Sequence, residues 1–277
     1  MLVGVRWDSL YRYSQAVRLL HTELRVLPAD AFGQRRLNAS LQLEPPANPQ
    51  RLVDAFGNEY HHVDFVDEIE EIHVAVEAEV ETAEAAVPDP GISPLMRHLL
   101  LSETSRSPFD PAIATFAEAI PDGLDPVATA EAVCTFLSDE FQFEVGPTDV
   151  DSTALDLIRL GSGVCQDFTH LMLAMLRMHG IPSRYVSGYL APHEGEDIGD
   201  AGHAWVQLLA PDGWHGFDPS NNSPQDGRYV VTAVGRDYDD ISPLRGAFSG
   251  IANEHWSAVV RVRSTPSAPS TQDQDQQ

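Results

Sequence analysis

The chain has 277 residues, 43% of them hydrophobic, and 17 basic residues stand against 42 acidic ones for a net charge of −25. Such acidity disfavours binding to nucleic-acid backbones and to anionic membrane surfaces. No apolar run approaches the roughly 18 residues of a membrane-spanning helix, and the N-terminus lacks the basic and apolar regions of a secretion signal, so we expect a cytoplasmic protein.

Residues from about 10 to 88 have the pattern of β-structure. Apolar and polar residues alternate from Leu37 to Leu43 and again from Ile72 to Val80. This is the period of strands with one buried face. Gly57-Asn58 marks a turn between two further strands. We therefore predict an antiparallel β-sandwich-like domain over residues 1–88.

The histidines of this region and the cysteines of the chain offer little for a metal site or a disulfide framework. His61, His62 and His73 have no accompanying Cys or His at ligand spacing, so we expect no metal there. Cys134 lies in a helical pattern and is predicted to be a small core residue. A disulfide between Cys134 and Cys165 is disfavoured in a cytoplasmic chain.

Helical signals begin after the segment Val87–Gly91, which is the predicted domain boundary. Helices are expected to start at Ser93-Pro94, at Asp110-Pro111 and at Asp125-Pro126, each with proline in the first turn. Their expected ends are near Leu101, Ile120 and Phe141, and a further helix runs from Asp151–Ala154 to about Leu160. Helices followed by strands predict an α+β core over residues 89–263.

The next helix carries the first candidate catalytic residue. Gly161–His170 opens a helix that ends near Gly180, and Cys165 lies in its first turn. The positive end of the helix dipole favours a thiolate there, and the thiolate is the nucleophilic form. The alternative interpretation is a buried structural cysteine.

Two strands after this helix complete a catalytic pattern. His203 lies where the segment Gly199–Leu208 enters a strand, and Asp218 ends the strand in Gly213–Asn221. If these strands form a hairpin, His203 and Asp218 come close on one face. A thiol nucleophile needs such a base and such an orienting carboxylate.

Three motifs carry a resemblance to a known family. Gly161–Phe168, His203–Val206 and Trp214–Pro219 read GSGVCQDF, HAWV and WHGFDP, and they resemble the transglutaminase-like superfamily in its bacterial form. The resemblance implies a papain-like fold. Tyr11–Pro28 and Asp54–Asn58 also resemble the N-terminal region that precedes the core in these bacterial proteins, so the similarity covers nearly the whole chain to about residue 263.

Four side chains are expected to border the site. Gln166 follows the nucleophile, Tyr189 lies on the strand Ser183–Leu190, and Trp205 and Trp214 lie in the two catalytic strands. All three aromatic residues have an alternative role as plain core residues. The acidic segment Pro192–Asp200 is a candidate lid, although a solvated loop is the more common role of such a sequence.

The implied mechanism is acyl transfer through a thioester, with Cys165 as nucleophile, His203 as base and Asp218 as the group that holds the histidine. The Cys165 backbone N–H supplies one oxyanion donor, and the side chain of Gln166 or Trp205 is a candidate for the second. The expected substrate is a protein or peptide amide, and no cofactor is needed. The alternatives are a cysteine peptidase or amidase with the same residues and a non-catalytic binding module.

The C-terminal part has no assigned chemistry. Gly235–Tyr238 and Pro243–Gly246 share the family resemblance, and a last strand is expected near Trp256–Val262. The low-complexity segment Ser264–Gln277 is predicted to be disordered.

Overall fold

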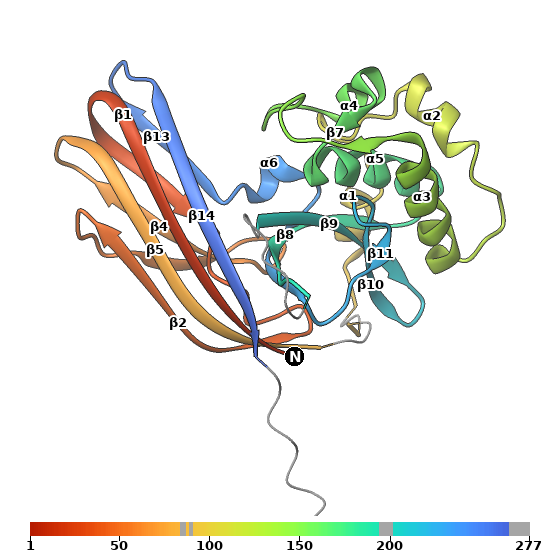
Figure 1. The fold of residues 1–277 in the computed structure, drawn as a ribbon, viewed down its shortest axis with the longest axis horizontal. Helices are drawn as coiled ribbons and strands as arrows, with labels where there is room; N and C mark the ends of the chain where they lie inside the picture. The colour runs from red at the N-terminus through yellow and green to blue at the C-terminus, as the bar shows by residue number, and fades with distance from the viewer. Residues whose placement is uncertain (84–86, 89–90, 194–201, 266–277) are drawn as a thin grey trace, which may run out of the picture.

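A computed structural model describes residues 1–83, 87–88, 91–193 and 202–265 of the chain. Figure 1 shows two parts side by side, one made of long strands and the other of helices around a shorter sheet. None of the helices in this part of the chain is long and apolar enough to cross a membrane. Residues 194–200 of the candidate lid Pro192–Asp200 and the tail beyond residue 265 lie outside the described residues.

The first part is a seven-stranded antiparallel sheet that is centred on β1. Its strands are β1 (Leu2–Leu24), β2 (Gln34–Glu44), β3 (Gln50–Val53), β4 (Glu59–Phe65), β5 (Ile69–Thr82), β13 (Leu244–Ser249) and β14 (Glu254–Thr265). The first half of β1 pairs with β5 and β14, and the second half pairs with β4 and β13. The pairing with β5 shifts register between Arg12 and Val17, so the sheet curls over and both halves enclose one apolar core.

The alternation predicted for β5 is confirmed, because Ile72, Val74, Val76, Ala78 and Val80 are all buried. In β2 the alternation predicts burial less well. Leu37 is 46% exposed because the register with β5 shifts between Arg36 and Asn38, which leaves Leu37 unpaired. β2 is also an edge strand, so fewer neighbours cover its side chains.

The second part is the α+β core expected from the sequence. Its helices are α1 (Pro94–Leu99), α2 (Pro111–Ala117), α3 (Pro126–Glu140), α4 (Ala154–Leu160), α5 (Cys165–Met178) and α6 (Tyr238–Ile241). The first three start as predicted, because Ser93, Asp110 and Asp125 each accept hydrogen bonds from backbone N–H groups of the first turn.

Helix α5 is the centre of this core. The sequence predicted an apolar stripe on one face, yet residues 166 to 177 are all buried. The helix packs on the core sheet with one side and contacts α2, α3 and α4 with the others. Cys134 of α3 is a buried free thiol in the same core, and Cys165 is also free.

The core sheet places the two catalytic candidates that follow α5. It contains β8 (Ser183–Leu190), β9 (Gly202–Ala210), β10 (Gly213–Asp218), β11 (Ser223–Pro224) and β12 (Tyr229–Gly235), and the short strands β6 (Gln142–Phe143) and β7 (Ser162–Gly163) pair separately. The strand order is β11-β10-β9-β8-β12, and all pairs are antiparallel. The expected hairpin is therefore present as β9 and β10.

Two amide side chains fasten the two parts together along β12, the last strand of the core sheet. Asn58 donates to the Val234 carbonyl over 2.7 Å and accepts from the Val234 N–H over 2.8 Å. Gln34 makes the same pair of contacts with Val231, at 2.8 Å each. Both amides thus satisfy backbone groups at the free edge of β12. The division at residue 88 stays a prediction, but β13 and β14 return to β1 from beyond it.

Candidate active site

The N-terminus of α5 is held so that Cys165 is its first residue. The Asp167 carboxylate accepts a hydrogen bond from the Val164 N–H over 2.8 Å and another from the Thr148 hydroxyl over 2.7 Å. Gly163 is needed here, because a Cβ at this position would lie 2.6 Å from the Asp167 carboxylate. The Cys165 side chain is partly exposed, as a nucleophile must be.

His203 and Asp218 meet across the hairpin. The register pairs Phe217 with Val206, which places Asp218 beside the end of β9 that carries His203. The His203 Nε2 donates to Asp218 Oδ2 over 2.6 Å. The expectation that these two side chains lie on one face of the hairpin is therefore confirmed.

Asp218 is fully buried, and five further hydrogen bonds reach its carboxylate. One oxygen accepts from the backbone and hydroxyl of Ser220 and from the Asn221 N–H, and the other accepts from the Asn221 amide and the Tyr229 hydroxyl. Burial opposes ionisation of Asp218, but the hydrogen bonds from His203, Asn221 and Ser220 outweigh it and lower the pKa to about 2. Asp218 is therefore a carboxylate at neutral pH.

His203 is also hydrogen-bonded to Cys165. Burial favours the neutral imidazole, but the electrostatic interaction and hydrogen bond with Cys165 and the contact with Asp218 outweigh it and raise the pKa of His203 to about 10. Trp205 stacks against the imidazole with ring centroids 6.2 Å apart. The ring is thus fixed between Cys165 and the Asp218 carboxylate, in a position to exchange a proton with Cys165 or with a ligand.

A cavity of about 270 Å³ opens above Cys165 and His203, between the two parts of the molecule. The core contributes Gln166 and Tyr189 to its lining, as expected. The opposite wall comes from the curled sheet and includes aromatic residues that the sequence did not single out, namely Trp7, Tyr11 and Trp256. Trp256 is 46% exposed and stacks on Tyr11, so its ring is available to a ligand.

Trp205 and Trp214 do not line the cavity, contrary to expectation. Trp205 is completely buried, and its indole N–H donates to Gln225 over 2.9 Å, so it is engaged and cannot serve as an oxyanion donor. Trp214 is buried beneath the Arg184 guanidinium, whose central carbon lies 3.9 Å from the ring centroid. Gln166 therefore remains the candidate for the second donor beside the Cys165 N–H.

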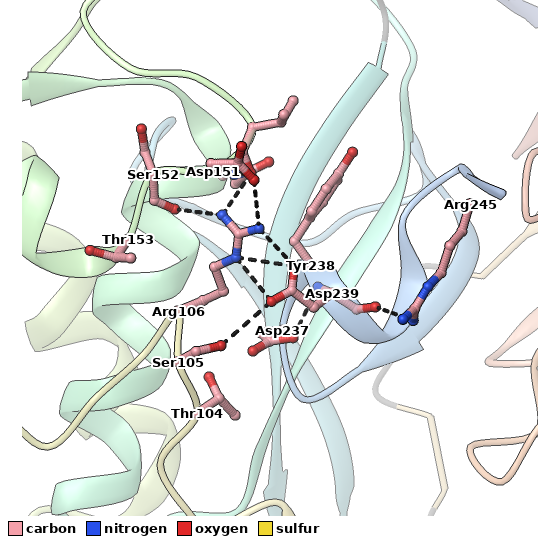
Figure 2. A network of polar contacts seen from close by, with 12 residues as sticks. Thr104, Ser105, Arg106, Asp151, Ser152, Thr153, Asp237, Tyr238, Asp239 and Arg245 are labelled. Atoms are coloured by element: carbon pink, nitrogen blue, oxygen red, sulfur yellow. Dashed lines mark hydrogen bonds and ion pairs between the residues drawn. The ribbon is translucent and has the colours of Figure 1, made fainter. Parts of the chain in front are cut away.

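A polar network around Arg106 lies next to residues that line the cavity, and Figure 2 shows its contacts. The Arg106 guanidinium donates to the Asp239 carboxylate of α6 over 2.7 Å and to the Val150 carbonyl over 2.7 Å. The same carbonyl accepts a hydrogen bond from the Gln166 side chain over 3.2 Å. Val150, Gln166 and Tyr238 all line the cavity. The network thus fixes α6 and the loop that orients Gln166, and sequence patterns gave no sign of it because its members lie far apart in the chain.

Two other histidines of the core, His170 and His215, do not line the cavity. His170 is completely buried and packs on Tyr185, with ring centroids 5.2 Å apart. Burial and the nearby Arg106 and Arg177 charges lower its pKa to about 3, so it stays neutral. His215 contacts Asp212 over 2.9 Å and is partly buried.

Both parts of the chain match models of bacterial transglutaminase-like proteins or of their superfamily. Residues 114–219 match the transglutaminase-like superfamily, and residues 3–81 match the bacterial transglutaminase-like N-terminal region. An uncharacterized protein of Mycobacterium leprae is 29% identical, over 91% of this chain and 95% of its own length. An uncharacterized protein of Mycobacterium tuberculosis is 30% identical, over 85% and 84%.

A solved structure from Cytophaga hutchinsonii, provisionally assigned as a cysteine protease, has a similar fold. It superposes with a TM-score of 0.77 at 21% identity and covers 97% of this chain and 93% of its own. The similarity thus includes the curled sheet as well as the core, and the relative arrangement of the two parts is shared.

Proposed function

Because the chain belongs to the transglutaminase-like superfamily and carries the bacterial N-terminal region of that superfamily, we propose that it is a cysteine enzyme that breaks amide bonds through a thioester on Cys165. The observation that carries the proposal is His203, which contacts both Cys165 and the buried Asp218 at the floor of the cavity. A thiolate beside an imidazolium is the active form of a cysteine nucleophile.

In the first step the Cys165 thiolate attacks the amide carbonyl carbon and forms a carbon–sulfur bond. The negative oxygen of the tetrahedral intermediate lies at the start of α5, where the Cys165 N–H is a donor and Gln166 is the candidate for the second. The carbon–nitrogen bond then breaks, and the leaving amine takes the proton of His203. Asp218 keeps the histidine oriented for this transfer.

In the second step an amine or a water molecule attacks the thioester. His203 takes the proton of the attacking group, the carbon–sulfur bond breaks and the Cys165 thiolate is restored. An amine gives a new amide, and water gives a carboxylic acid. The aromatic wall of Trp7, Tyr11 and Trp256 supports amine transfer, because apolar side chains reduce the access of water to the thioester.

The first experiment incubates the protein with a glutamine-containing peptide and hydroxylamine, and measures ammonia and hydroxamate. Cys165→Ala and His203→Ala are expected to abolish both products. The 277 residues contain no lysine, so cross-linking of the protein to itself through lysine does not complicate the assay. A lysine acceptor must accordingly come from another molecule.

The outcomes separate the competing functions. Ammonia with hydroxamate indicates a transferase, ammonia without hydroxamate indicates a deamidase, and cleavage of a peptide library indicates a peptidase. If no amide reacts although Cys165 is accessible to iodoacetamide, the proposal is wrong and the fold serves as a binding module. A cytoplasmic location stays a prediction that cell fractionation checks.

A further inference from the structure

Two histidines and an aspartate converge on the outer face of the curled sheet, away from the cavity. His21 lies in the second half of β1, directly opposite Asp64 of β4, and His62 lies two residues before Asp64 on the same face. The possible ligand atoms of these three side chains all lie within 4.8 Å of one another. Among the described residues, no other group of three His, Cys, Asp or Glu residues meets this criterion.

Both imidazoles face the same carboxylate oxygen. His21 Nδ1 lies 2.5 Å from Asp64 Oδ1, and His62 Nε2 lies 3.0 Å from that oxygen. The two rings are nearly parallel, with an angle of 18° and centroids 6.2 Å apart.

The register of β1 with β4 sets the direction of His21. The pairing is regular from Leu20 opposite Phe65 to Leu24 opposite His61, and it places His21 directly opposite Asp64. A slip of one residue in this pairing would turn His21 to the buried face. On its other side β1 pairs with β13, and that pairing shifts register between Arg18 and His21, where Leu19 has a φ of 49°.

We propose that His21, His62 and Asp64 bind one divalent transition-metal ion, with Zn²⁺ as the best match to two imidazoles and a carboxylate. Bonds of about 2.0–2.2 Å to a tetrahedral ion separate the ligand atoms by roughly 3.4 Å, so each imidazole nitrogen must move away from Asp64 Oδ1 by less than about 1 Å. The side chains of His21, His62 and Asp64 have room for this adjustment, because their exposed fractions are 60%, 28% and 46%. Water completes the coordination on the open side.

The ion would join β1 to β4 in the part of the sheet that also contains β13. Its role is therefore to stabilise the curled sheet, and it is separate from the proposed amide chemistry. The spacing of histidines in the sequence does not predict this site. His61 and His73 lie near His62 in the sequence, whereas its partner His21 lies in another strand, β1.

The test titrates Zn²⁺ into tag-free, chelator-treated full-length protein by isothermal titration calorimetry. The background variant is Cys165→Ala, because a thiolate beside an imidazole would also bind zinc. We expect one equivalent to bind and the melting temperature to rise. His21→Gln and Asp64→Asn should each weaken binding by at least about tenfold. His73→Gln is the matched control, because His73 also contacts carboxylates on the same sheet, Asp8 over 3.0 Å and Glu44 over 4.0 Å, but lies outside the proposed site, and it should leave the affinity unchanged.

Three results would overturn the proposal. They are the absence of stoichiometric binding in the Cys165→Ala protein, an undiminished affinity in both ligand variants, and an equal loss in His73→Gln. The metal-free melting temperature of each variant shows whether it is folded, so a loss of binding is attributable to the missing ligand. Because Cys165 is absent throughout, the result is independent of whether the amide chemistry is correct.

Discussion

Asp218→Asn is the substitution that examines the proposed chemistry most directly. The backbone N–H groups of Ser220 and Asn221 both point at one carboxylate oxygen, and a backbone N–H can only donate a hydrogen bond. The amide oxygen of asparagine must therefore take that position, and its NH₂ group faces His203. Two donors then oppose each other unless the His203 Nε2 gives up its proton. The remaining ring nitrogen would carry the proton and could no longer accept one from Cys165.

The expected loss follows from this change of tautomer. Removal of a positioned general base costs about 10²–10⁴ in rate, or roughly 3–5 kcal/mol of transition-state stabilisation. Thiol reactivity should change as well. An unpaired cysteine is only about 0.3% thiolate at pH 6, so loss of the ion pair lowers the alkylation rate at that pH by up to about 300-fold. His203→Ala removes the imidazole altogether, so its alkylation rate is the lowest rate expected and is the reference for Asp218→Asn.

The assay is the rate of alkylation by iodoacetamide between pH 5 and 9, followed by mass spectrometry. It reports on Cys165 alone in the folded protein, because Cys134 is only 2% exposed and burial raises the pKa of its thiol. Tyr229→Phe is the matched control, since it removes one donor to Asp218 and leaves the carboxylate charge in place. A folded Asp218→Asn protein that is alkylated at pH 6 as fast as the wild type would refute the reasoning.

Three further predictions concern stability and recognition. Asn58→Ala leaves the N–H and C=O of Val234 without their partners and should lower the free energy of unfolding by about 2–4 kcal/mol, measured by urea denaturation; a loss below about 1 kcal/mol would show that water replaces the amide. The pKa of Asp218 is lowered in the folded state to about 2, so its ionisation should add about 2–3 kcal/mol to the free energy of unfolding above pH 4, and this contribution is lost as the pH falls to 2. If the free energy of unfolding of Asp218→Asn falls between pH 4 and pH 2 as much as that of the wild type, the prediction is wrong. Trp256→Ala should raise KM roughly tenfold and leave the alkylation rate unchanged, because only the wall of the cavity is altered; an unchanged KM would remove β14 from substrate recognition.

The sequence predicted those features that local signals determine. The starts of α1, α2 and α3 were correct because each has a polar cap followed by proline, and the cap and the proline act within one turn. The meeting of His203 and Asp218 was also predictable, because a short hairpin fixes both positions.

The features that were missed depend on contacts between distant segments. Trp256 reaches the cavity only because β14 pairs with β1, and nothing near Trp256 in the sequence indicates that pairing. Trp205 and Trp214 were misassigned because alternation along a strand does not show which face a neighbouring element covers. The same limitation concealed His21 as a neighbour of His62.

The pairing of β1 with β14 has a consequence for how the protein is made. β14 leaves the ribosome more than 200 residues after β1, which takes about 10–50 s at ordinary rates of synthesis. Until then one edge of β1 is open, and the wall that carries Trp256 does not exist. The nascent chain can thus form the helix that carries Cys165 and the hairpin that carries His203 before β14 closes the cavity. The Cys165 thiol is therefore in place before the wall that covers it.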